Sequence, residues 1–254
     1  MYDSDGSSSR RAFLAGTAGS LAALAGCTST FQSGGGGSPN DGGTTTSGAS
    51  DSLLYASDAK TGFGIDLAGN PIMGSADAPL DVYYWTDYQC PFCARFEKET
   101  LPKLVKNYVR PGELRMVVME NPYFGEASRT AARMSKCVWR QVRAETPDAY
   151  SRWHSAVFDE QGKKNSGWAK KSNLLDITEG VEDVDADAVD AGLAENAKAV
   201  KSSVDDDVTA ASQSGIRGTP AFVFYNPSSD VSGKLVGAQP YPLFEKAIRK
   251  MKNA

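Results

Sequence analysis

The chain has 254 residues, of which 41% are hydrophobic, so one sizeable core with flanking tails is the expected organisation. Its formal net charge of -4 and its pI of about 5.2 argue against a nucleic-acid-binding surface and against a polybasic membrane surface. Its four cysteines are too few and too unevenly spaced for a small disulfide-stapled scaffold. Each cysteine therefore needs its own explanation.

The N-terminus has the pattern of an export signal. Arg10 and Arg11 precede an apolar run of small residues over 15–25, which is too short to cross a bilayer. The paired arginines resemble the twin-arginine signal, whose pathway exports folded proteins across the prokaryotic cytoplasmic membrane. The run ends in Leu-Ala-Gly-Cys, which resembles a lipobox, so a signal peptide over 1–26 is expected to leave Cys27 as a lipid anchor. An ordinary signal with an incidental cysteine is the alternative.

A flexible tether is predicted over 27–52. This stretch consists mostly of Gly, Ser, Thr and Asn, includes four consecutive glycines at 34–37, and has almost no large apolar side chain. Such a composition cannot bury enough surface to fold. The folded domain is therefore expected over 53–254.

The first half of this domain is predicted to be a βαβ unit. Residues 80–85 are rich in aromatic and β-branched side chains, which favours a strand. Apolar residues at helical spacing across 101–108 predict an amphipathic helix that Pro102 should kink. The nearly continuous apolar run over 114–119 is typical of a strand buried on both faces.

The second half is predicted to begin with a helical insertion over about 125–214. Apolar stripes at helical spacing recur in it, and 185–213 is predicted to be helical throughout. A strand is then expected at 221–225, followed by a weaker strand around 234–236 and a closing helix around 244–251.

A pair of cysteines lies where the first strand gives way to a helix. Cys90 is expected at the helix N-terminus, where free backbone N–H groups and the helix dipole stabilise a thiolate. Pro91 suits the first helical position because its missing N–H would have had no partner there. Cys93, one turn later, can close a disulfide with Cys90. The pattern predicts a nucleophilic Cys90 and a resolving Cys93.

Half of a zinc site is the main alternative for this Cys-x-x-Cys spacing. Two further ligands would be needed, and the sequence offers only Cys137 and the sole histidine, His154, which are not paired at the usual short spacing. We therefore expect no metal. No dinucleotide-binding or haem-attachment motif is evident either, so the Cys90–Cys93 disulfide is expected to be the redox group itself.

Two segments carry a family resemblance. Residues 85–93, Trp-Thr-Asp-Tyr-Gln-Cys-Pro-Phe-Cys, resemble the active-site segment of DsbA-like disulfide oxidoreductases of the bacterial envelope. Residues 215–222, Gly-Ile-Arg-Gly-Thr-Pro-Ala-Phe, resemble that family's cis-proline loop. The resemblance extends from about residue 70 to the C-terminus. It implies an α/β fold, the thioredoxin fold with an inserted helical subdomain.

The resemblance also implies roles for residues around the cysteines. Pro220 would be cis and face the cysteine pair, which leaves the backbone of Thr219 free to pair with an extended substrate chain beside Cys90. Pro91 and Phe92 would contribute contacts to the bound substrate. Gly-Thr-Pro alone would be an ordinary turn before a strand, and its combination with the cysteine pair favours the functional interpretation.

The function expected from these residues is an exported thiol-disulfide oxidoreductase, held at the outer face of the cytoplasmic membrane as a lipoprotein. Its partners would be extracytoplasmic proteins with cysteines and a membrane redox partner, without nucleic acid. A disulfide reductase and a noncatalytic holdase or binding lipoprotein are the alternatives. Direction of turnover is left open by the sequence.

Three positions near the cysteines depart from the family pattern or modify it. Many members carry a buried acid six residues before the nucleophile, where this chain has Tyr84, so another group or water must exchange the proton of Cys93. Asp87 could substitute for that acid or could lie in an exposed loop. Phe92 between the cysteines offers neither charge nor a hydrogen bond to a thiolate, so a less extreme oxidant is expected.

Other reactive or charged residues have simpler interpretations. Cys137 is expected to be a buried, inert small hydrophobe, and His154 to serve packing or to lie at the surface. The aspartates at 205–207 and the lysine pairs at 163–164 and 170–171 are expected on solvated faces.

Overall fold

A computed structural model describes residues 52–254 of the chain. The predicted signal peptide, the lipid-anchor cysteine Cys27 and nearly all of the predicted tether fall on residues 1–51 and lie outside the described residues. In the described part, no helix is both long and apolar enough to span a membrane.

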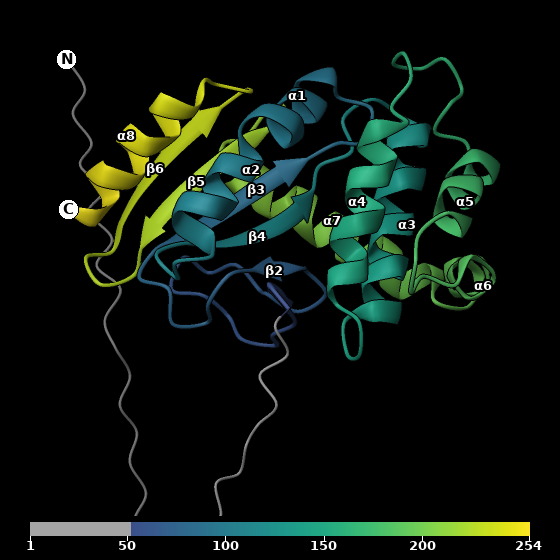
Figure 1. The fold of residues 1–254 in the computed structure, drawn as a ribbon, viewed down its shortest axis with the longest axis horizontal. Helices are drawn as coiled ribbons and strands as arrows, with labels where there is room; N and C mark the ends of the chain where they lie inside the picture. Colours follow the sequence, from purple (N-terminus) through teal and green to yellow (C-terminus); the bar gives the residue numbers. More distant parts are fainter. Residues whose placement is uncertain (1–51) are drawn as a thin grey trace, which may run out of the picture. The chain divides into compact units, whose positions relative to one another are not determined.

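A six-stranded mixed sheet forms the centre of the domain (Figure 1). Its two middle strands are parallel and the outer pairs are antiparallel, which is the arrangement expected from a βαβ unit followed by a hairpin. In spatial order the strands are β1 (Leu54–Tyr55), β2 (Ile72–Met73), β4 (Arg115–Glu120), β3 (Asp81–Thr86), β5 (Ala221–Asn226) and β6 (Val231–Val236).

Both faces of this sheet are covered. Successive side chains of a strand point to opposite faces, so Tyr84 belongs to one core and Trp85 to the other. The Tyr84 face is covered by α1 (Pro91–Glu99) and α8 (Tyr241–Lys252), and α7 (Ala197–Gln213) lies on the Trp85 face (Figure 1). Burial on both faces explains why β3 and β4 are almost continuously apolar.

The predicted helical insertion is confirmed. It consists of α3 (Glu126–Val142), α4 (Asp148–Asp159), α5 (Lys171–Glu179), α6 (Ala186–Glu195) and α7. Large aromatic side chains from α3 and α4, Trp139, Tyr150 and Trp153, are buried between these helices. They continue the core of the Tyr84 face into the insertion.

Two helical segments of the chain are interrupted. The segment 185–213 is not helical throughout, because α6 ends at Glu195. The next residue, Asn196, has φ of -103° and ψ of 16°, which interrupt the helix before α7 begins. The kink expected from Pro102 is confirmed as a break at Thr100, whose φ is -116°. Beyond the break the chain forms the short α2 (Leu101–Leu104) and a π-helical turn over Val105–Val109.

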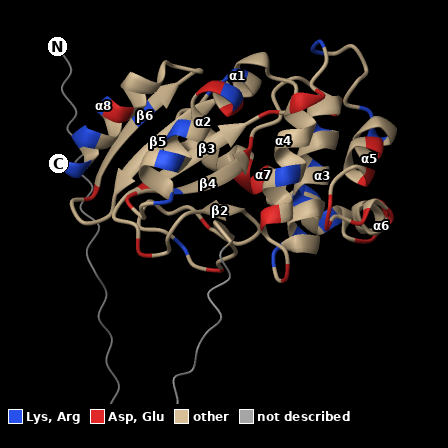
Figure 2. Ribbon diagram, viewed as in Figure 1, with Lys and Arg blue, Asp and Glu red and all other residues tan. Residues whose placement is uncertain are grey.

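Charge of both signs is distributed over the helices (Figure 2). Helix α6 carries only acidic charged residues, whereas the last turn of α8 contains Arg249, Lys250 and Lys252. Acidic and basic charge is therefore concentrated on different helices of residues 52–254. A cationic helix C-terminus is also the favourable arrangement with the helix dipole.

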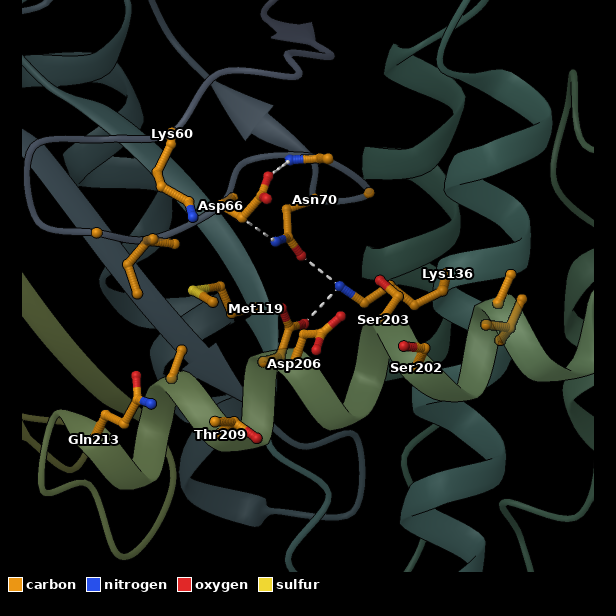
Figure 3. A pocket seen from close by; sticks show the side chains of 18 of the residues that line it. Lys60, Asp66, Asn70, Met119, Lys136, Ser202, Ser203, Asp206, Thr209 and Gln213 are labelled. Carbon is orange, nitrogen blue, oxygen red and sulfur yellow. Dashed lines mark hydrogen bonds and ion pairs between the residues drawn. The ribbon is translucent and has the colours of Figure 1, made fainter. Parts of the chain in front are cut away.

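The prediction that the aspartates at 205–207 all face solvent is wrong for Asp207. Its carboxylate is 2% exposed and forms an ion pair of 2.5 Å with the ammonium group of Lys136, which is equally buried. The Lys136 ammonium also donates to Asn70 at the edge of a polar cavity of about 730 Å³ (Figure 3). Three segments distant in sequence are thereby joined at one buried charge pair.

Candidate active site

Cys90 lies at the junction of the central strand and α1, as the sequence predicts. It is the N-cap residue of α1, with extended backbone angles of -82° and 116°, and Pro91 occupies the first helical turn. The Cys90 N–H donates to the carbonyl of Asp87, which closes the turn from β3. The first turn of α1 contains no acidic residue, so no side-chain charge opposes a thiolate there.

The two cysteines have opposite acid strengths. A hydrogen bond from the Cys93 thiol, supported by Thr219 and by the backbone N–H groups of Cys93 and Phe92, lowers the pKa of Cys90 to about 6. Cys93 is fully buried, with 0% of its surface exposed, and this burial raises the pKa of its thiol well above the ordinary value. At neutral pH the pair therefore holds one thiolate, on Cys90, and one thiol, on Cys93.

The cis-proline loop meets Cys90, as the resemblance implies. The peptide bond between Thr219 and Pro220 is cis, which confirms that prediction. The Cys90 sulfur lies 3.3 Å from the Thr219 carbonyl oxygen, to which it can donate only in its thiol form. In residues 52–254, the Thr219 N–H has no backbone acceptor and its hydroxyl is buried without a partner. The loop thus brings an unused backbone donor beside the sulfur.

Access to Cys90 is narrow, because the residue is only 1% exposed. Beside it, Phe92 is 53% exposed, and the Arg95 guanidinium lies 5.2 Å from the centre of its ring. Phe92 borders a groove of about 810 Å³ between α1 and the loop before α8, which Pro240 and Tyr241 also line. An apolar surface therefore adjoins the entrance to the sulfur.

Asp87 does not lie in an exposed loop. Its carboxylate is buried and accepts backbone N–H groups from Gln89 at 2.8 Å, Tyr123 at 2.6 Å and Phe124 at 3.2 Å. Burial raises the pKa of Asp87, whereas these three hydrogen bonds oppose the rise. Asp87 fastens the active-site turn to the segment that follows β4.

Tyr84, which stands where the family pattern has a buried acid, contacts the carboxylate of Glu97. The Tyr84 hydroxyl lies 2.7 Å from the Glu97 carboxylate, and the same carboxylate oxygen lies 3.1 Å from Nε2 of His154. His154 is thus buried and packed among aromatic side chains, so of the two expected positions, packing and the surface, the structure has packing. Glu97 was missed by the sequence analysis. Its spacing of four residues from Cys93 on a helix is the signal that could have found it.

Cys137 is buried on α3, as predicted, and burial raises its pKa to about 11. In the described chain Cys90, Cys93 and Cys137 are all free thiols. No group of three or more His, Cys, Asp or Glu side chains within residues 52–254 is arranged to hold a metal ion.

A family model described as thioredoxin matches residues 67–227. The chain belongs to the thioredoxin family. The active-site turn, the cis-proline loop and the helical insertion of this thioredoxin-family chain lie within the matched residues or directly beside them.

Similar curated proteins are named as disulfide bond formation proteins. Disulfide bond formation protein D of Bacillus subtilis is 31% identical over 111 residues, which are 44% of this chain and 48% of that protein. A probable disulfide bond formation protein D of Bacillus cereus is 25% identical over 150 residues, covering 59% of this chain and 67% of that protein. The match to the B. subtilis protein thus spans about half of its length.

Solved structures show the same fold. Oxidised BdbD from B. subtilis superposes with a TM-score of 0.64 at 24% identity, covering 79% of this chain and all of that chain. DsbA from Chlamydia trachomatis superposes with a TM-score of 0.61 at 19% identity, covering 72% and 91%. The thioredoxin fold with an inserted helical subdomain is therefore confirmed.

Proposed function

We propose that the chain is a thiol-disulfide oxidoreductase that forms or reshuffles disulfides in extracytoplasmic proteins through Cys90 and Cys93. The single observation that carries this proposal is the asymmetry of the pair. Cys90, with a pKa lowered to about 6, is poised as a thiolate beside an unused backbone donor, and the buried Cys93 remains a thiol. The names of the relatives support the same activity.

The proposed cycle begins with the Cys90–Cys93 disulfide. A substrate thiolate attacks the Cys90 sulfur, forms a mixed disulfide with it, and releases Cys93. A second substrate thiolate then attacks the substrate sulfur of the mixed disulfide, so the substrate gains a disulfide and Cys90 leaves as a thiolate. The low pKa of Cys90 makes it a good leaving group, which favours oxidation of the substrate.

Substrate binding would use Pro91, Phe92, Thr219 and Pro220. The Thr219 N–H and C=O can add an extended segment by backbone hydrogen bonds, which recognises any sequence. The exposed Phe92 ring and the adjoining groove would add apolar contacts that an unfolded chain can supply. Broad use of unfolded, cysteine-containing proteins follows. No external cofactor is needed in this cycle, because the cysteine pair carries the electrons.

The place of action we propose is the outer face of the cytoplasmic membrane. Export through a twin-arginine signal over 1–26, lipidation at Cys27 and a tether over 27–52 would suspend the domain over 53–254 there. A membrane redox partner would reoxidise the pair. The anchor is tested by detergent partition. The mature protein should enter the detergent phase, and the Cys27→Ala variant should stay in the aqueous phase.

The activity is tested by oxidation of a reduced, unfolded substrate protein. The oxidised chain should restore its disulfides, Cys90→Ser should abolish this activity, and Cys93→Ala should accumulate a mixed disulfide with the substrate. Alkylation of Cys90 should follow a pKa near 6. A Cys90 that alkylates no faster at neutral pH than a cysteine in a free peptide would overturn the assignment and favour a noncatalytic binding protein.

The direction of turnover is tested by redox titration against glutathione. An oxidase requires a potential well above that of the reducing thioredoxins, about -270 mV. A potential at or below that value would favour a reductase that delivers electrons outside the membrane.

A further inference from the structure

A second groove, besides the one that Phe92 borders, opens beside the cis-proline loop. It has a volume of about 410 Å³ and lies between α3, α7, the segment after β4 and the loop that leads to Pro220. Its apolar lining consists of Tyr123, Val204, Val208, Ala211 and Ile216. Tyr123 is 60% exposed and Val208 is 38% exposed, so part of this lining is open to solvent. Exposed apolar surface inside a groove is available to a side chain of another molecule.

The charged lining of this groove, which we call the basic groove, is mainly cationic. Its four cations are Arg129 and Arg133 of α3, Lys201 of α7 and Arg217 of the loop. Two carboxylates offset part of this charge: Glu126 lies 2.9 Å from Arg133 and 3.9 Å from Arg129, and Asp205 lies 2.5 Å from Lys201. The basic groove therefore keeps an excess of two positive charges, although the chain as a whole has a formal charge of -4.

Arg217 is the cation without a counter-charge. Within residues 52–254, the ion pairs of the basic groove use its other three cations and none uses Arg217, which is exposed. An arginine presents a planar set of donors that fits a carboxylate with two parallel hydrogen bonds. The carboxylate of a bound molecule can therefore pair with Arg217 without displacing an internal partner.

The basic groove starts where a client segment would leave the reacting sulfur. Arg217 precedes Thr219 by two residues, and the Thr219 carbonyl oxygen lies 3.3 Å from the Cys90 sulfur. An extended chain advances about 3.3 Å per residue, so a client strand paired with Thr219 would pass Arg217 about 7 Å from the client cysteine. Client side chains two or three positions from that cysteine would thus lie over the basic groove. Among the described residues, none lines both this groove and the one beside Phe92.

We propose that the basic groove is a second client subsite, which selects extended segments that carry acidic side chains two or three positions from the reacting cysteine. The inference rests on the proposed function and names a class of preferred client. Pairing at Thr219 accepts any sequence, and the basic groove adds a preference by speeding the association of acidic segments. A protein segment is the occupant we assign, because the apolar lining and the adjoining backbone of Thr219 suit a polypeptide, whereas a lipid phosphate would use the cations alone.

The test is the rate at which single-cysteine peptides open the Cys90–Cys93 disulfide of the full chain in a nonionic detergent. Three peptides differ only at the positions two and three residues on either side of the cysteine, which hold Glu, Gln or Lys. Each rate is divided by that peptide's rate with 2-hydroxyethyl disulfide, because neighbouring charges also change the pKa of the peptide thiol. The normalised rate should be about 10-fold higher for the Glu peptide than for the Gln peptide at low salt. About 1 M salt should bring the two rates together, since it screens exposed charges.

Charge reversal tests the assignment to the groove itself. One reversal changes the local charge by two, so Arg217→Glu should make the Glu and Gln peptides react equally, whereas Arg217→Lys should keep the wild-type preference. Adding Arg129→Glu to Arg217→Glu should reverse the preference, so that the Lys peptide reacts fastest. If this double variant does not fold, Arg217→Glu and the salt dependence of wild type decide the matter. The control is Arg249→Glu on α8, which changes the net charge equally but does not line the groove and should keep the wild-type preference.

The outcomes separate this inference from the proposed function. If wild type reacts with all three peptides at equal normalised rates, or if Arg217→Glu keeps the preference, the basic groove is not a client subsite and the proposed function stands. If there is no peptide preference and the Cys27→Ala chain binds phosphatidylglycerol vesicles only while Arg217 is present, the groove takes lipid headgroups and the assignment to clients is overturned. If no peptide opens the disulfide of wild type, the proposed function and the subsite fail together.

Discussion

At the scale of single residues, the acid strengths of the two cysteines depend on how deeply each sulfur is buried and on the hydrogen-bond donors around it. Cys90 is stabilised as a thiolate chiefly by the Cys93 thiol, with Thr219 and two backbone N–H groups assisting. The side chain between the cysteines, Phe92, points largely to solvent and adds no hydrogen bond to this set. The position of Phe92 is therefore open to electrostatic tuning.

Replacing Phe92 by histidine tests this tuning. A protonated imidazole beside Cys90 would favour its thiolate, so Phe92→His should lower the pKa of Cys90 below about 6 and make the pair more oxidising. Thiolate absorbance during a pH titration and a redox titration measure the two effects. Phe92→Leu is the control, since it keeps an apolar side chain. An unchanged pKa in Phe92→His would show that the exposed side chain does not communicate with the sulfur.

Sequence patterns at this scale predicted where the cysteines and the proline lie better than they predicted the side chains around them. The Cys-x-x-Cys spacing and the cis-proline loop are local motifs, so Cys90, Cys93 and Pro220 could be named in advance. Glu97 and His154 lie 57 residues apart and meet only in the fold. Asp87 could not be interpreted for the same reason, because two of its three backbone partners come from the segment after β4.

At the scale of elements, the buried pair of Lys136 on α3 and Asp207 on α7 joins the first helix of the insertion to its last. Removal of one member leaves the other as an uncompensated buried charge. Lys136→Met should therefore lower the free energy of unfolding by about 3–5 kcal/mol, measured by chemical denaturation.

The control for this pair lies on the same helix. Lys201 and Asp205 of α7 form an exposed ion pair, so Lys201→Met should cost only about 0.5 kcal/mol. The double variant Lys136→Met with Asp207→Leu should recover much of the lost stability, because an apolar pair leaves no unpaired charge. Equal costs for Lys136→Met and Lys201→Met would contradict the assignment of Lys136 as a buried partner.

The end of β4 makes stability depend on pH. Burial raises the pKa of Glu120 from 4.5 to about 8, although Lys136 opposes the rise. Between these values the folded chain binds more protons than the unfolded chain, so stability is fully present below pH 4.5 and is lost as the pH rises toward 8. The loss through this group is up to about 1.4 kcal/mol per pH unit.

Glu120→Gln should remove this dependence. Denaturation midpoints of wild type should fall from mildly acidic pH to pH 8, and those of the variant should change less over the same interval. Asp206→Asn, which alters an exposed carboxyl on the neighbouring α7, should keep the wild-type slope. A wild-type slope in Glu120→Gln would assign the effect to another group.

At the scale of the whole molecule, periodicity predicted the order of elements because each face of the sheet is covered. Strands buried on both sides read as apolar runs, and helices covering them show apolar stripes. The two-residue strands β1 and β2 were not predicted, since so short a segment has no period. They form by pairing, β2 with β4 and β1 with β2. The break at Asn196 escaped prediction because Asn disfavours a helix only weakly.

At the same scale, residues 28–52 are mostly Gly, Ser and Thr and have almost no large apolar side chain, so we expect the segment before Ser52 to be dispensable for folding. A chain that begins at Ser52 should unfold at the same denaturant concentration as the mature full chain and should oxidise a soluble peptide at the same rate. Only its partition into detergent should change. A large loss of stability in the shortened chain would show that residues before Ser52 contribute to the domain.

The exposed ring of Phe92 beside the sheltered Cys90 carries a consequence for how long a client stays attached. An apolar segment of the client can contact the Phe92 ring only while the client is unfolded, because native proteins rarely expose large apolar patches. The second substrate thiolate breaks the covalent bond to Cys90, and folding of the client would then remove the remaining apolar contact with Phe92. A client that has gained its disulfide but is still unfolded would therefore leave more slowly than one that has folded.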